Sequence, residues 1–139
     1  MPKQSEMFDH TADIGLAGRG GSLGELFEAM AEGLARFICP AGAAEGETVR
    51  TVAVAAEDVE ALLVDFLWQV MTIVQFEHLV VAAVRVEEIS ETSVRAALRC
   101  AAFDPARHEM ANEVKAVTYH QISVAREGAG WSGRVILDL

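Results

Sequence analysis

Residues 8–15 hold the densest group of potentially reactive side chains in this chain. Asp9, His10, Thr11 and Asp13 place two carboxylates, one imidazole and one hydroxyl within five consecutive positions. Carboxylates and imidazoles bind metal ions and transfer protons, so this segment is the first candidate for a functional site.

A second candidate lies at the other end of the sequence, where residues 135–139 read Val-Ile-Leu-Asp-Leu. A charge such as that of Asp138 is costly in an apolar strand unless a cation or hydrogen bonds compensate it. Calcium and magnesium prefer hard oxygen ligands. We therefore expect the two ends to meet, where Asp13, Asp138 and the carboxylate of Leu139 could supply such ligands. The simpler alternative is that Asp138 points to solvent from the end of a strand.

Composition indicates one globular domain that spans residues 1–139, because 52% of the residues are hydrophobic and 23% are charged. Eleven basic and 21 acidic residues give a net charge of −10. Such a charge repels phosphate backbones, so we expect no tight, direct nucleic-acid binding and instead a basic protein partner or cations. Cys39 and Cys100 lack the spacing of a zinc site, which favours two reduced core thiols in a cytosolic protein.

No signal peptide is expected, because residues 1–7 are polar and no apolar stretch follows them. Residues 62–81 are hydrophobic, but Asp65, Gln75 and Glu77 interrupt them, and a membrane span needs about 20 mainly apolar residues. We interpret this stretch as a buried helix followed by a strand. The protein is thus expected to be soluble and cytoplasmic, with no membrane partner.

The spacing of apolar residues predicts two amphipathic helices among several strands. Ser22 and Glu25 form a capping box that opens the first helix, which ends before Pro40. Glu57 and Asp58 place negative charge at the start of the second helix. Strands are predicted at residues 12–18, 48–55, 79–86, 94–102, 113–125 and 131–139. This order favours an α+β two-layer sandwich, with both helices on one face of a mostly antiparallel sheet.

The last two predicted strands suggest how Asp138 is surrounded. If residues 127–130 form a four-residue hairpin loop, Tyr119 lies opposite Asp138. Because side chains alternate between faces, Lys115 would then share a face with Asp138 and approach the carboxylates. A slip of one residue would reverse this arrangement.

Glycines in residues 18–24 offer a different possibility, since glycine-rich turns before helices often bind phosphates. The segment lacks the Lys-Ser/Thr ending of a P-loop and the GxGxxG spacing, so a plain turn and helix cap is the better interpretation. No Cys-His pair is arranged in an obvious nucleophile pattern, and a hydrolase is not indicated.

Four segments together resemble the archease family over nearly the whole chain. They are DHTADIG at residues 9–15, SLGELF at 22–27, EVKAVTYH at 113–120 and VILDL at 135–139. The resemblance implies an α/β sandwich that contains a strand-helix-strand-strand module with an insertion.

The resemblance also implies a function. Archeases are not enzymes but activate the GTP-dependent RNA-splicing ligase of tRNA splicing. They promote guanylylation of the ligase histidine and allow the ligase multiple turnovers. The family's divalent metal site, with calcium as the expected ion, maps onto Asp13, Asp138 and Leu139. Lys115 is expected to be functional by the same resemblance. Asp9 and His10 are expected to brace the turn.

Two other classes of function stay open at this point. A general chaperone or protein-interaction module is compatible with a small acidic sandwich. A stand-alone metal-dependent enzyme acting on phosphates is the other, but the sequence shows no recognisable general base or nucleophile for it.

Overall fold

The fold was analysed in a computed structural model that describes residues 2–10 and 13–139, with the side chains of Asp9 and His10 outside the description. Within these residues the chain forms seven strands and two helices. In chain order they are β1 (Gln4–His10), β2 (Asp13–Gly20), α1 (Leu23–Ile38), β3 (Thr48–Ala55), α2 (Val59–Phe76), β4 (Leu79–Ile89), β5 (Ser93–Ala102), β6 (Ala116–Glu127) and β7 (Gly130–Asp138). The predicted α+β class and both predicted helices are confirmed.

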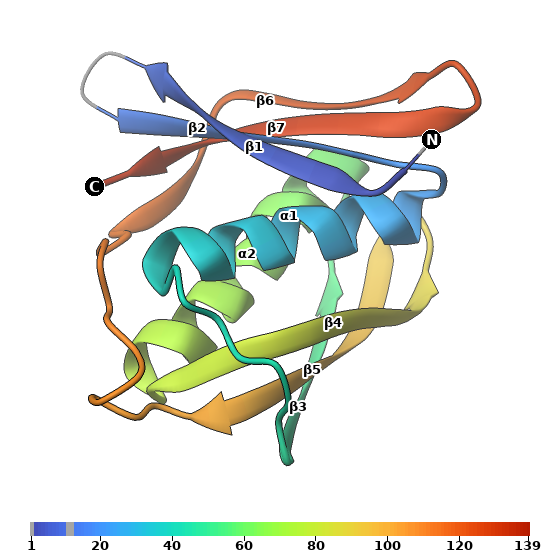
Figure 1. The fold of residues 1–139 in the computed structure, drawn as a ribbon. Helices are drawn as coiled ribbons and strands as arrows, with labels where there is room; N and C mark the ends of the chain where they lie inside the picture. The colour runs from blue at the N-terminus through green and yellow to red at the C-terminus, as the bar shows by residue number, and fades with distance from the viewer. Residues whose placement is uncertain (1, 11–12) are drawn as a thin grey trace.

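The strands form two antiparallel sheets, and the helices lie between them (Figure 1). One sheet has the order β1-β2-β7-β6 and the other the order β3-β5-β4. Each helix therefore has a sheet on two sides, where the sequence had indicated a single sheet. The reason is visible in α2, where ten of 18 residues are buried, from Val59 to Val74. A helix with so wide an apolar surface needs cover from both sides.

Helix α2 is long and apolar enough, by length and composition alone, to cross a membrane. In this fold it is a core helix. Its Phe66 ring packs against Phe27 of α1, with centroids 5.4 Å apart, and both side chains are fully buried. The buried residues of α1 and α2 form one continuous core with the inner faces of both sheets.

Helix α1 also covers the open edge of β4. The Glu32 carboxylate accepts a hydrogen bond from the amide of Val84 at 3.2 Å, and the Glu28 carboxylate accepts one from Val86 at 2.8 Å. The Lys3 ammonium lies 3.5 Å from Glu28 and 3.3 Å from Glu32. These contacts satisfy amides that an edge strand would otherwise present to another chain.

The predicted capping box is confirmed at the start of α1. Ser22 Oγ accepts a hydrogen bond from the Glu25 amide at 3.1 Å, while the Glu25 carboxylate accepts one from the Gly21 amide at 3.2 Å. A Cβ on Gly20 would collide with the backbone at Leu26. The glycines thus serve a tight turn, and two amides that could have bound a phosphate are already used.

Both cysteines are buried and free, as expected of reduced core thiols. Burial raises the pKa of the Cys100 thiol to about 11, so the thiol stays protonated at neutral pH.

A small cluster of side chains covers the outer face of the four-stranded sheet. Gly15 pairs with Phe8 on one side and with Ile136 on the other. The Phe8 ring occupies the space that a side chain at Gly15 would fill. The Arg134 guanidinium lies 4.9 Å from the Phe8 ring centroid, in cation–π contact. Ile136 is fully buried in this setting.

We predict that Gly15→Ala destabilises the protein by about 1–3 kcal/mol, because the new methyl group must displace the Phe8 ring. Urea unfolding followed by circular dichroism measures this change. Gly24→Ala is the matched control, since its new Cβ would make only ordinary contacts with Val86, at 3.5 Å, and should leave stability equal or slightly higher. Equal urea midpoints of unfolding for Gly15→Ala and Gly24→Ala would contradict the prediction.

Candidate functional site

Antiparallel pairing of β2 with β7 brings the two predicted carboxylates together. Ile14 pairs with Leu137, so continuing the register by one residue places Asp13 opposite Asp138. Side chains alternate along a strand, and Leu137 is buried on the inner face. Asp13 and Asp138 therefore share the outer face at the same end of the sheet.

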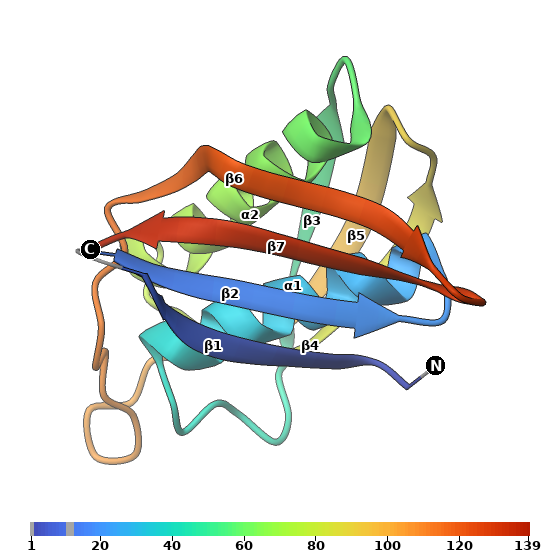
Figure 2. The ribbon, with the colours of Figure 1, turned by 90° about the horizontal axis from the view of Figure 1, so that it is seen from above.

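Strand β6 adds the third predicted element to this end. Ala116 pairs with Asp138, and the Lys115 amide donates a hydrogen bond of 2.8 Å to the Asp138 carbonyl. In both ribbon views the C-terminus lies beside the start of β2, at the end of the sheet where β6 begins (Figures 1 and 2). We call Asp13, Asp138, Leu139 and Lys115 the tip.

The predicted register around Asp138 is wrong in one respect. Arg126 pairs with Trp131 as expected, but β6 gains three extra residues between Thr118 and Ser123. Ala116, and not Tyr119, therefore lies opposite Asp138. Because three is an odd number, the face that each residue occupies is also reversed. Lys115 adjoins Asp138 through its main chain, and its position in the alternation is on the opposite face.

Local contacts explain the bulge. Gln121 has a φ of 54°, in the left-handed region, which breaks the regular strand. The Thr118 hydroxyl donates to the Ile136 carbonyl at 2.9 Å and accepts from the His120 amide at 3.3 Å. Hydroxyl bonds of this kind compete with the regular sheet ladder. They could not be foreseen from apolar spacing.

The bulge turns Tyr119 toward α2. Its hydroxyl donates a hydrogen bond of 3.2 Å to the Asp65 carboxylate. Partial desolvation, followed by the neighbouring negative charge of Asp65, raises the pKa of Tyr119 above its ordinary value. The tyrosine is thus a neutral hydrogen-bond donor that ties β6 to the helix.

The remaining predicted site residues precede Asp13. The backbone of His10 pairs with Asp13 and that of Asp9 with Ile14. Their side chains, and residues 11–12, lie outside the described part of the chain. The expectation that Asp9 and His10 brace the turn stays a prediction.

The chemistry of the tip fits a hard divalent cation. Asp138 is exposed and Asp13 half-buried, and both end in carboxylate oxygens. Among the described side chains, no group of three or more His, Cys, Asp or Glu could hold a metal. Further protein ligands would thus be main-chain oxygens such as those of Leu139, and water would complete the shell that calcium prefers.

A second feature adjoins the tip on the helix side. Residues 103–115, which we call the strap, connect the two sheets and cross the C-terminal ends of α1 and α2 (Figure 1). The Gln75 amide donates to the Val114 carbonyl at 2.9 Å and accepts from the Val114 amide at 2.7 Å. Asn112 donates to the Phe37 carbonyl at 2.8 Å. The strap is thereby held to both helices.

Between the strap and α2 lies a pocket of about 500 Å³, which we call the Trp68 pocket. Its lining is mainly apolar, with Lys115 at one side. The lining residues are Ile38, Trp68, Met71, Gln75, Phe76, His78, Met110, Asn112, Glu113, Val114 and Lys115. Sequence reasoning missed this pocket. The available signal was that Trp68 and Phe76 lie outside the apolar stripe of the second helix.

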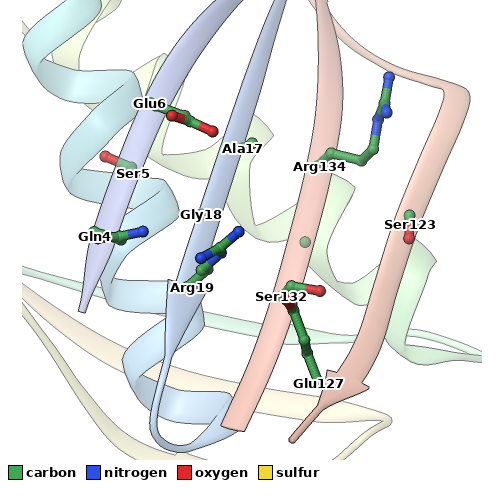
Figure 3. A pocket seen from close by; sticks show the side chains of 11 residues that line it. Gln4, Ser5, Glu6, Ala17, Gly18, Arg19, Ser123, Glu127, Ser132 and Arg134 are labelled. Carbon is green, nitrogen blue, oxygen red and sulfur yellow. The ribbon is translucent and has the colours of Figure 1, made fainter. Parts of the chain in front are cut away.

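A polar hollow of about 290 Å³ lies on the outer face of the four-stranded sheet (Figure 3). Arg19 and Arg134 line it together with Glu6 and Glu127, among serine and glycine residues. Two guanidinium groups are thus balanced by two carboxylates. This hollow carries no excess charge that would select an anion.

We predict that Gln75→Ala loosens the strap, because the substitution leaves both Val114 backbone groups without their hydrogen-bond partner at a cost of about 1–3 kcal/mol. Amide hydrogen exchange at Val114 should accelerate, while exchange in β2 stays unchanged. Thr72→Ala is the control, since the Thr72 hydroxyl bonds only within α2, to the Trp68 carbonyl. Unchanged exchange at Val114 would show that the pair does not hold the strap.

Comparisons with known proteins agree with this architecture. Residues 6–139 match the model of the Archease protein family (MTH1598/TM1083). Proteins named Protein archease from Methanosarcina acetivorans and Pyrococcus abyssi are 35% and 38% identical to this chain. The first alignment covers 99% of this chain and 97% of the relative, and the second covers 99% of each.

Two solved structures are similar over nearly the whole chain. The solution structure of Methanobacterium thermoautotrophicum protein 1598 has a TM-score of 0.74 and 29% identity, and covers 97% of this chain and 98% of its own. A crystal structure described as an archease, possible chaperone, from Thermotoga maritima has a TM-score of 0.64 and 19% identity, and covers 96% of each chain. The second likeness bears on the fold alone.

Proposed function

This chain belongs to the archease family, and from that premise we propose that it is a non-enzymatic cofactor of a GTP-dependent RNA-splicing ligase. The chain would promote guanylylation of the ligase histidine and multiple turnover during cytoplasmic tRNA splicing. The observation that carries the proposal is the register that places Asp13 opposite Asp138 at one end of the sheet. This register brings together two acidic groups from opposite ends of the sequence, of which Asp138 is exposed and Asp13 half-buried.

The tip is the part of the molecule that we assign to activation. Asp13, Asp138 and a main-chain oxygen of Leu139 would hold a divalent metal through hard oxygen donors, and calcium is the ion that the family resemblance implies. When bound, the metal would offset the repulsion between the two carboxylates and supply a positive charge at the surface. The backbone bond from Lys115 to Asp138 keeps β6 beside these groups.

Charge supports a protein partner over a direct RNA contact. The net charge of −10 opposes association with phosphate backbones. A ligase that binds RNA and nucleotide needs a basic surface, and an acidic cofactor is attracted to such a surface. The cofactor would thus reach the ligase without competing for RNA.

A second candidate function is a general chaperone. Exposed aromatic surface favours it, since Phe76 is 73% exposed and Trp68 is 37% exposed. A chaperone that uses this apolar surface would not depend on Asp13 or Asp138, so substitutions at the tip separate the two functions.

We predict that Asp13→Asn and Asp138→Asn each weaken calcium binding at least about tenfold and largely abolish the stimulation of multiple-turnover RNA ligation by the cognate ligase. Calorimetry measures calcium binding, and a ligation assay with excess RNA over ligase measures stimulation. Circular dichroism should report an unchanged fold, because Asp138 is exposed and Asp13 only half-buried.

Glu91→Gln is the control for the loss of one negative charge, since Glu91 is exposed in the turn between β4 and β5. It should stimulate ligation as the wild type does. Full stimulation by both tip variants would exclude the proposed role of the tip. Suppression of aggregation of an unrelated unfolded protein, equal in wild type and tip variants and without any ligase stimulation, would favour the chaperone.

A further inference from the structure

The Trp68 pocket has the composition of a protein-binding site. Trp68, Phe76, Met71 and Met110 line it, and aromatic and methionine side chains are enriched in the parts of interfaces that contribute most binding energy. Methionine also adapts its shape to an incoming group. Ile38, Met71 and Val114 belong to the buried core, so the pocket opens onto the core, and Trp68 and Phe76 are the exposed apolar side chains that line it.

Two features fix the local structure at the edge of the pocket. Trp68 cannot fold inward to fill it, because its indole N–H donates a hydrogen bond of 2.9 Å to the Val117 carbonyl. His78 also lines the pocket and has a φ of 53°, in the left-handed backbone region that residues other than glycine rarely adopt. This turn ends α2 and leaves Phe76 extended into solvent, with 73% of its surface exposed.

The pocket continues directly into the tip. Lys115 lines the pocket, while its amide donates to the Asp138 carbonyl at 2.8 Å. Lys115 is exposed and makes no ion pair with any described residue. An ammonium group at the side of an aromatic pocket favours an aromatic occupant, whose ring face attracts a cation.

We propose that the Trp68 pocket receives an aromatic side chain from a basic segment of the partner ligase, and that this contact supplies affinity while the tip supplies activation. The inference rests on the proposed function. An aromatic ring would pack against the apolar lining, and its face would attract the Lys115 ammonium group. The basic flanks match Glu113 at the pocket and the net charge of −10.

The test separates affinity from activation. The protein is titrated into the ligase, and ligation is fitted for the half-saturating concentration and for the plateau of stimulation. Phe76→Ser should raise the half-saturating concentration about tenfold and leave the plateau unchanged, as expected for loss of an exposed hot-spot contact. Phe76→Tyr, which keeps the ring, should stay within about twofold of the wild type.

Val49→Ser is the matched control, because Val49 is also an exposed apolar residue, 54% accessible, but lies on β3 outside the pocket. It should leave both quantities unchanged. Binding measured without RNA or nucleotide, by ¹⁹F NMR of protein labelled with 5-fluorotryptophan, gives a readout independent of activation. The Trp68 resonance, assigned with Trp131→Phe, should shift when ligase is added.

Several results would overturn the proposal. An unchanged half-saturating concentration for Phe76→Ser, with normal stimulation by the wild type, would remove the pocket and leave the proposed function standing. If, without ligase, the wild type sediments as a larger species than Phe76→Ser does, the result would show that Phe76 joins two copies of this chain. A shift of the Trp68 resonance on adding GTP alone would indicate a nucleotide pocket. Absence of stimulation by the wild type would remove both proposals.

Discussion

Pairing between β2 and β7 is the interaction on which the rest of this structure depends. It joins residues from opposite ends of the sequence along seven consecutive pairs, from Ile14 with Leu137 to Gly20 with Trp131. Val135 and Leu137 are fully buried against the helices. A slip of one residue would instead turn the charged side chains of Arg134 and Asp138 toward the helices, and burying such charges is costly. Burial of β7 thus determines which carboxylates meet at the tip.

The bulge in β6 shows how one strand serves two layers. Below it, β6 follows β7 in regular pairing from Ser123 to Glu127. Above it, Thr118 is bonded to Ile136, whereas Tyr119 is bonded to Asp65 and the Val117 carbonyl to Trp68. The three extra residues let the strand satisfy partners on both the sheet and α2. The same shift in register explains why Lys115 lines the pocket and does not share the face of Asp138, as had been predicted.

Sequence reasoning recovered features that depend on local chemistry, and it missed those that depend on pairing between distant segments. The cap at Ser22 and both helices follow from spacing of three to four residues. Strand β1 was missed because its sequence, QSEMFDH, is mainly polar and carries little apolar alternation. The second sheet was missed because an apolar strand does not reveal its neighbours. The meeting of the two chain ends is an exception, because it was expected from the unusual charge of Asp138 in an apolar strand, and β2 does pair with β7.

The tip and the Trp68 pocket would respond differently to salt, although they share Lys115. Charges at the tip lie at the surface, and at 1 M salt the Debye screening length falls to about 3 Å, which weakens their attraction for a partner. Burial of an aromatic ring in the pocket is not screened in this way and is strengthened by excluded salts. The backbone bond between Lys115 and Asp138 joins the two regions, so a partner bound at the pocket would lie next to the tip. Positioning of this kind is how binding far from the reacting atoms contributes to their reaction.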